Sequence, residues 1–173
     1  MSNGQASTGA VDSIGPVLGR VPSGLFIVTW REGDADRVML TSWLMQAGFE
    51  PPAISLAVGH GRQFLTAART ASLRFVVNLL GDTQRNMLGR FGKPPAPGDD
   101  PFAGLAITRS PCGAVILPET VGWLECCSRP LAASTPEMEA TGDHVLVVAN
   151  VVGAGTGSAE TPLVHLRKSG LHY

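Results

Sequence analysis

The chain has 173 residues and a net charge close to zero, with 13 basic and 14 acidic side chains. That length suits one domain whose core is large enough to need no metal or disulfide. Only 16% of the residues are charged, against about 25% in an average domain, which favours a surface partly buried in an oligomer. The near-neutral charge argues against nucleic acid as the main partner.

Signals for membrane insertion, secretion and metal binding are weak. The longest apolar stretch, residues 145–154, reaches only about half the length that a membrane-spanning helix needs. The polar first residues do not resemble a signal peptide, and three cysteines without a C-x-x-C pair predict reduced thiols, at least one of them in the core. The histidines show no metal-ligand spacing. We therefore expect a cytoplasmic protein with no membrane association and no metal site.

The apolar pattern predicts a chain of short strands. Residues 1–13 lack such a pattern and are expected to form a flexible tail before a single domain over residues 14–173. Runs of β-branched and aromatic residues between turn-forming residues are typical of strands. Such runs occur at residues 25–30, 38–44, 53–58, 73–80, 105–108, 114–117, 121–127 and 144–152.

Helical periodicity is confined to two short segments, residues 62–69 and 83–91. The proline-rich residues 93–101 predict a stiff exposed loop. The glycine-rich residues 153–158 predict a flexible hairpin loop, because no helix follows them to complete a dinucleotide-binding motif. Many short strands with few helices favour a mainly β fold, and a closed barrel over a doubly wound sheet.

The sequence Gly59-His60-Gly61-Arg62 lies between a predicted strand and a predicted helix. Glycines allow the backbone to turn its N–H groups toward an anion, and a helix N-terminus adds favourable partial charge. An arginine binds a phosphate through two parallel hydrogen bonds. The segment is therefore either a phosphate-binding loop or a simple turn.

Residues 41–52 carry a hydroxyl pair, an indole and an amide in what is expected to be a loop between two strands. Backbone groups and Gln46 would suit the polar edge of a planar heterocycle, while Trp43 would cover its apolar area. In the alternative interpretation, Trp43 belongs to the core and Gln46 is a solvated turn residue.

Two further polar residues stand out in apolar surroundings. Asn78 interrupts a predicted strand, so it is either a structural bridge or a ligand contact. His144 follows Gly142-Asp143 at the start of another strand, where a turn is the simplest interpretation. The chain has no G-x-S-x-G motif and no local Ser, His and acid constellation.

Six segments, taken in chain order, make the sequence resemble the flavin reductase-like, FMN-binding split-barrel family. The resemblance runs from about residue 18 to residue 173, and its segments are residues 21–29, 39–52, 75–80, 124–126, 142–144 and 162–165. The Ser-Trp-x-x-Gln-Ala sequence and the closing residues 165–173 are similar to the branch that includes flavin reductase domains of flavodiiron proteins.

The resemblance implies a mainly β split barrel with a few short helices, and a homodimer with FMN at or near its interface. It places the flavin phosphate on the 59–62 loop with help from Thr66, and the nicotinamide donor near His144 and Lys168. FAD is a possible replacement for FMN, and the donor is NADH or NADPH. With the residue-based candidates, the expected flavin-binding set is Thr41, Ser42, Trp43, Gln46, Ala47, Gly48, Gly59, His60, Gly61, Arg62, Thr66 and Asn78.

Three functions follow from this resemblance. The first is an NAD(P)H-dependent flavin reductase that transfers hydride to flavin. The second is an FMN-binding electron-transfer protein fed by a redox protein partner. The third is a non-catalytic flavin-binding module. The proline-rich residues 93–101 could cover a nicotinamide site in the first case.

Overall fold

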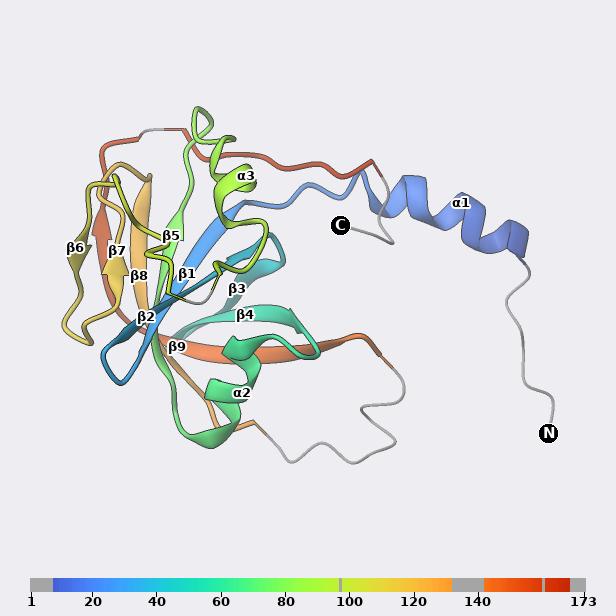
Figure 1. The fold of residues 1–173 in the computed structure, drawn as a ribbon. Helices are drawn as coiled ribbons and strands as arrows, with labels where there is room; N and C mark the ends of the chain where they lie inside the picture. The colour runs from blue at the N-terminus through green and yellow to red at the C-terminus, as the bar shows by residue number, and fades with distance from the viewer. Residues whose placement is uncertain (1–7, 97, 132–141, 160, 169–173) are drawn as a thin grey trace.

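In a computed structural model of the chain, which describes residues 8–96, 98–131, 142–159 and 161–168, the main element is a curled antiparallel sheet (Figure 1). The sheet has seven strands in the order β2-β1-β5-β8-β9-β4-β3. They are β1 (Phe26–Glu32), β2 (Ala35–Thr41), β3 (Leu44–Phe49), β4 (Pro52–Gly59), β5 (Arg74–Leu79), β8 (Gly122–Ser128) and β9 (His144–Thr156). A separate two-stranded sheet pairs β6 (Thr108–Arg109) with β7 (Val115–Ile116). The mainly β split barrel expected from the sequence is confirmed.

Both faces of β1 are buried, which explains why its sequence is continuously apolar rather than alternating. Val28 and Trp30 point into the core inside the curled sheet, where Trp30 packs edge-on against Phe64 with ring centroids 5.3 Å apart. Ile27 points to a second core on the outer face. There Thr29 donates a hydrogen bond of 2.6 Å to the carbonyl of Val115 and so ties β1 to β7.

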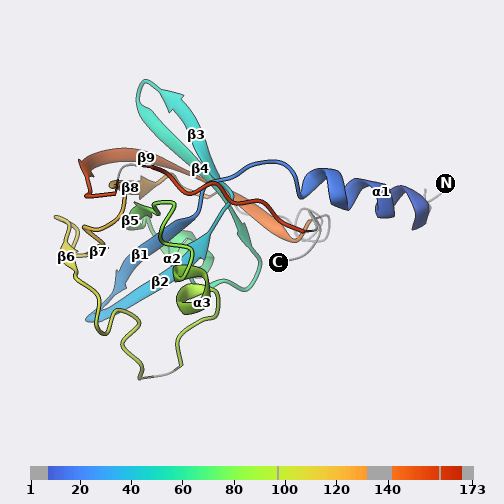
Figure 2. The same cartoon turned by 90° about the horizontal axis from the view of Figure 1, so that it is seen from above.

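Short helices cover the barrel. Helix α2 (Gln63–Thr70) closes the inner core with its apolar face, and helix α3 (Met87–Phe91) packs on the second core. The structure also contains helix α1 (Thr8–Leu18), which projects from the barrel in two perpendicular views (Figures 1 and 2). A flexible tail over residues 1–13 was expected there; residues 8–13 are helical instead, and residues 1–7 lie outside the described part of the chain.

Two expected loops are strands. Residues 44–49 form β3, which pairs with β4 in a hairpin that stands out from the barrel in Figure 2. Residues 153–156 extend β9 instead of forming a loop. The glycine at 155 lies opposite Trp123 on β8, and a Cβ there would approach the indole Nε1 to 2.6 Å. The glycine at 155 therefore makes room for a cross-strand aromatic ring, a role that a glycine-rich sequence does not reveal.

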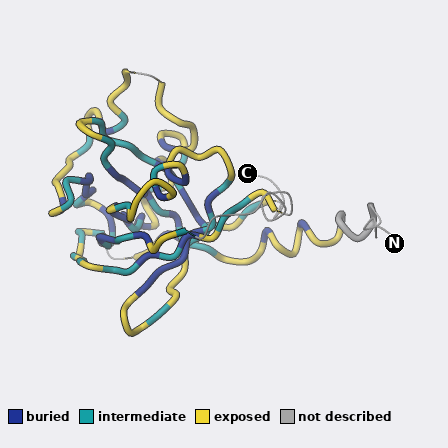
Figure 3. Tube along the Cα trace, turned by 90° about the horizontal axis from the view of Figure 1, so that it is seen from below, coloured by how far each residue is buried: buried dark blue, intermediate teal, exposed yellow. Residues whose placement is uncertain are grey.

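Exposed apolar side chains gather on the projecting elements, which are largely yellow in the burial view (Figure 3). None of the helices in the described part of the chain is long and apolar enough to cross a membrane.

Cys126 is fully buried as expected, and burial raises the pKa of its thiol to about 12. All three cysteines are free thiols.

Candidate functional site

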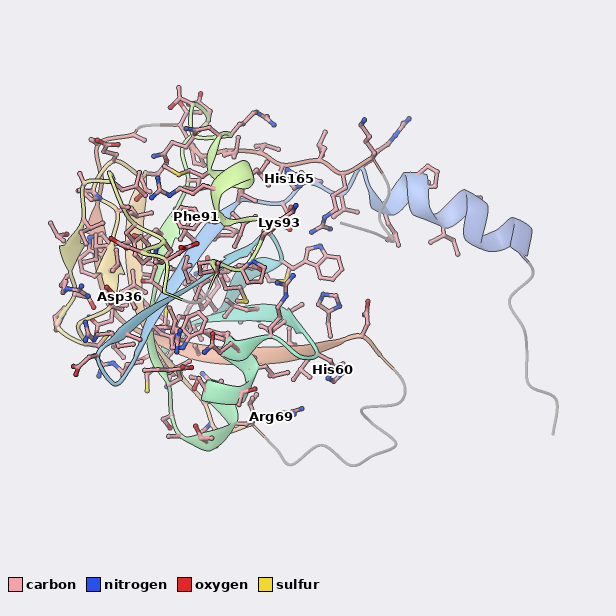
Figure 4. The ribbon with its side chains drawn as sticks, in the orientation of Figure 1. Asp36, His60, Arg69, Phe91, Lys93 and His165 are labelled. Carbon is pink, nitrogen blue, oxygen red and sulfur yellow. The ribbon has the colours of Figure 1, made fainter. Side chains whose placement is uncertain are left out.

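A cleft of about 1310 Å³ opens between four parts of the chain. Its walls come from β2, from the β4–α2 connection, from α3 with the proline-rich loop, and from residues 165–168. Figure 4 labels residues from each wall: Asp36, His60, Phe91, Lys93 and His165. The volume is somewhat larger than the 300–1,000 Å³ or so of a typical pocket for one small molecule, so the cleft has room for two ligands side by side.

The 59–62 loop borders one end of the cleft. Gly61 has a φ of +77°, a left-handed conformation that favours glycine, and this turn leads the chain into α2. The amide of His60 donates to the carbonyl of Asp143 at 3.0 Å, and the amide of Arg62 donates to Gly59 at 3.3 Å. Both amides are thus used inside the protein. An anion here would instead meet the Arg62 guanidinium and the first amides of α2.

Buried hydroxyls border another part of the cleft. Thr41 and Ser42, at the end of β2, are 7% and 4% exposed. Next to them Trp43 lies between two cleft residues: the Arg167 guanidinium is 4.5 Å from its ring centroid, and the ring of His144 is 4.7 Å away. Arg167 also donates a hydrogen bond to the Ser42 hydroxyl. Polar and aromatic groups therefore meet at this wall.

Positive charge predominates in the cleft. Its basic lining residues include Arg37, Arg62, Lys93, Arg167 and Lys168. Arg37 forms an ion pair of 3.0 Å with a glutamate outside the cleft. Within the described residues, Arg62, Lys93 and Lys168 have no carboxylate at ion-pair distance. A cleft of this charge suits an anionic ligand such as a nucleotide.

Hydrogen bonds and burial lower the pKa values of two aspartates and one histidine of the cleft. The Asp36 carboxylate accepts two hydrogen bonds of 2.8 Å from Arg109, which lower its pKa. A 2.8 Å hydrogen bond to the His144 ring lowers the pKa of Asp143. Burial lowers the pKa of His165, with a smaller contribution from the positive charge of Arg167. Neutral imidazole is thereby favoured at His165.

The structure brings together only part of the site expected from the sequence. Predicted residues that line the cleft are Thr41, Ser42, Gly59, His60, Arg62, His144 and Lys168. Trp43 touches the cleft residues Arg167 and His144 without lining it. Predicted residues outside the lining are Gln46, Ala47, Gly48, Gly61, Thr66 and Asn78. The first three belong to the projecting β3 strand, and Thr66 lies on the exposed side of α2.

Asn78 bridges three parts of the barrel through its side chain. Its side chain is fully buried. The amide nitrogen donates to the carbonyls of Ile27 at 3.2 Å and Val115 at 3.3 Å, and the amide oxygen accepts from the Leu117 amide at 2.8 Å. These internal bonds connect β1, β5 and the segment after β7. They use the amide nitrogen twice and the amide oxygen once, all inside the protein.

Sequence reasoning missed several lining residues, among them Arg37, Lys93, His165 and Arg167. Lys93 comes from the proline-rich loop, which the sequence presented only as a possible cover. His165 and Arg167 come from a segment whose backbone pairs with residues far away: the amide of His165 donates to the Ser23 carbonyl at 2.8 Å, and that of Arg167 donates to Gly19 at 3.0 Å. Such a long-range pairing cannot be predicted from a local sequence pattern.

Among the described residues, no His, Cys, Asp or Glu cluster suits a metal ion.

A curled antiparallel sheet with a basic cleft defines the class of split β-barrel proteins with room for an anionic ligand. Within that class, the chain belongs to the flavin reductase like domain family, which it matches over residues 18–170. The expected family is therefore confirmed.

Curated relatives include the putative diflavin flavoprotein A 6 of Nostoc sp., which is 34% identical over 158 residues, covering 90% of this chain and 26% of the relative. The diflavin flavoprotein A 1 of Synechocystis sp. is also 34% identical, with the same coverage. The chain thus spans about a quarter of the length of these relatives. Their names agree with the flavodiiron-type branch indicated by the sequence.

Solved structures share the fold. The Streptomyces globisporus NADH:FAD oxidoreductase SgcE6 superposes with a TM-score of 0.75 at 22% identity, covering 98% of this chain and 94% of that one. A homolog of nitrilotriacetate monooxygenase component B from Mycobacterium thermoresistibile gives 0.76 at 22% identity, with coverages of 93% and 86%.

Proposed function

We propose that the protein is an FMN-binding flavin reductase that uses NADH or NADPH as its hydride donor. The observation that carries this proposal is the cleft itself: buried hydroxyls at Thr41 and Ser42 and a basic 59–62 loop border one cavity of about 1310 Å³. The family membership supports a flavin as the ligand. A solved relative of the same fold, SgcE6, has been described in complex with NAD and FAD fragments.

The residues present fit FMN. Arg62 and the first amides of α2 would hold a terminal phosphate, while the hydroxyls of Thr41 and Ser42 would meet the polar edge of the ring system. One arginine at this end of the cleft matches one phosphate group, which favours FMN over FAD. The chemistry that a bound flavin supplies is acceptance of hydride and onward transfer of electrons.

His144 and Lys168 are the proposed residues of the nicotinamide side. Both line the cleft. His144 is oriented by the Asp143 carboxylate through its Nδ1 atom, and its ring is held by Trp43. Lys168 offers an ammonium group for the phosphates of the dinucleotide. Their role is to bind and orient the donor, because hydride transfer to a flavin requires no general base from the protein.

Purified protein is expected to bind FMN, and anaerobic addition of NADH or NADPH is expected to bleach the visible absorbance of the flavin, since hydride transfer reduces it. Absorbance spectra before and after each nucleotide test this directly. Bands that persist with both nucleotides would contradict the reductase and leave an electron carrier fed by a redox partner. A protein without affinity for FMN would contradict flavin binding altogether.

The same proposal includes a homodimer in the cytoplasm. Met45 and Leu146 are 68% and 62% exposed, and their strands β3 and β9 both pair with β4. The register puts Met45 beside Ser55 and Ser55 beside Val148, so Met45 and Val148 lie on one face of the three strands with the buried Ser55 between them. Phe49 at the end of β3 is 86% exposed. Apolar patches of this kind mark protein interfaces, and a second copy offers the same surface.

Replacing Met45 with glutamate is expected to convert the dimer to a monomer of 18.0 kDa, because a charge would be buried in the apolar contact. Light scattering coupled to size-exclusion chromatography measures the mass. The control is the neighbouring Gln46→Glu variant. The Gln46 side chain lies on the opposite face of β3 from Met45, so this variant is expected to stay dimeric. A wild-type protein with the monomer mass would contradict the dimer.

A further inference from the structure

The segment around Arg167 is anchored beside the β2–β3 turn by contacts on both its backbone and its side chain. Its amide donates to the Gly19 carbonyl at 3.0 Å, and the guanidinium stacks on Trp43 at 4.5 Å. The same guanidinium donates to the Ser42 hydroxyl. Stacking and hydrogen bonding together fix the plane of the guanidinium group, because its donors lie in that plane.

This contact determines where the Ser42 proton points. A guanidinium has donors only, so the Ser42 oxygen must be the acceptor in the bond from Arg167. The single hydroxyl proton then has to point elsewhere. In the described part of the chain, no acceptor takes that proton, although Ser42 is only 4% exposed and lines the cleft. A buried hydroxyl in this state is a hydrogen-bond donor directed at a cleft ligand.

The arrangement behind Ser42 is held in place over several residues. Trp43 packs against His144 at 4.7 Å, with an angle of 55° between the two rings, and His144 is bonded to Asp143 at 2.8 Å. The Arg167 guanidinium, the Trp43 indole and the His144 imidazole thus form a column along one wall of the cleft. The column limits rotation of Arg167 away from Ser42.

We propose that Arg167 is a positioning residue that orients the Ser42 hydroxyl so that its proton is donated to the ring of the bound flavin. The inference rests on the proposed function, since it takes flavin as the cleft ligand. The edge of an oxidised isoalloxazine presents carbonyl oxygens and ring nitrogens, which accept hydrogen bonds. A hydroxyl proton turned toward the ring matches these acceptors, and the nearby positive charge stabilises the negative charge of the reduced ring.

A double-mutant cycle on FMN affinity tests the assignment. Ser42→Ala and Arg167→Gln are each expected to weaken FMN binding about five- to tenfold, the usual range for one lost hydrogen bond. The double variant is expected to bind like Ser42→Ala alone, because Arg167 acts through the hydroxyl. In a Ser42→Thr background, which keeps the hydroxyl, Arg167→Gln is expected to retain its effect.

The midpoint potential of bound FMN gives a second readout that a merely structural role would not move. Arg167→Gln is expected to shift the potential to more negative values, because positive charge near the reduced ring is lost. Arg167→Lys is expected to recover most of that shift. The control is Arg129→Gln, which removes an exposed arginine outside the cleft whose side chain bonds to Asn150.

The outcomes separate the two proposals. Wild-type protein that binds no FMN would overturn the proposed function, and this inference with it. Wild-type binding with an Arg167→Gln variant that keeps both affinity and potential would overturn the inference alone. Additive losses in the double variant would also overturn it, since Arg167 would then act independently of Ser42.

Discussion

An Arg62→Ala variant is expected to bind FMN about 10- to 100-fold more weakly than the wild-type protein. The guanidinium lines the cleft at the 59–62 loop, and within the described residues no carboxylate competes for it. Because the His60 and Arg62 amides are already bonded inside the protein, the side chain carries much of the expected phosphate contact. A charge-assisted hydrogen bond contributes about 1.5–3 kcal/mol, which gives the expected factor.

Riboflavin makes this experiment specific, because it carries the same ring system without the phosphate. Fluorescence titration should show that Arg62→Ala loses affinity for FMN but not for riboflavin. Arg69→Ala removes an equal charge from the same helix outside the cleft, and it should leave both affinities unchanged. Equal losses for FMN and riboflavin would mean that Arg62 does not contact the phosphate. The FMN affinity of the wild-type protein should also fall with rising salt.

The second large effect concerns stability. Asn78→Ala is expected to lower the free energy of unfolding by about 3 kcal/mol, since it leaves buried backbone groups without partners. The groups concerned are the Leu117 amide and the carbonyls of Ile27 and Val115. For a chain of this length the loss corresponds to a fall in melting temperature of roughly 6–12 °C. Urea denaturation and calorimetry measure both quantities.

The matched control is Asn86→Ala at the N-terminus of α3. Asn86 is exposed and makes no side-chain capping hydrogen bond, so the same chemical change should alter stability by less than about 0.5 kcal/mol. If Asn78 contacted the flavin instead, its variant would keep wild-type stability and lose FMN affinity. That pattern would contradict the bridging role.

The strands that sequence reasoning predicted best are those buried on both sides. The sequences of β1, β4 and β5 are mostly apolar because each strand is buried on both faces, and such mostly apolar stretches are easy to recognise in a sequence. The edge strand β3 was missed, because a strand exposed on both sides has no apolar pattern to display. The end of β9 was missed because its glycines resemble a loop, although a Cβ at Gly155 would clash with the Trp123 ring on the neighbouring strand.

The residues of the candidate site also differ in how easily the sequence points to them. The 59–62 loop could be predicted because its chemistry is local: glycine conformation, a helix N-terminus and an arginine lie within a few residues of one another. The same holds for Thr41 and Ser42 at the end of a strand. Asn78 was ambiguous, since a buried amide looks alike in sequence whether its partners are backbone groups or a ligand.

What the sequence determined by itself was the class of fold, through the periodicity of its strands, and the family, through the resemblance of six segments taken in order. Only the tertiary structure decided which distant side chains share the cleft. Arg167 reaches Ser42 across 125 positions of the chain, through a segment that pairs with residues near its opposite end. Lys93 enters the cleft from a loop without any period. Contacts of this kind arise from the closure of the barrel, and no short stretch of sequence encodes them.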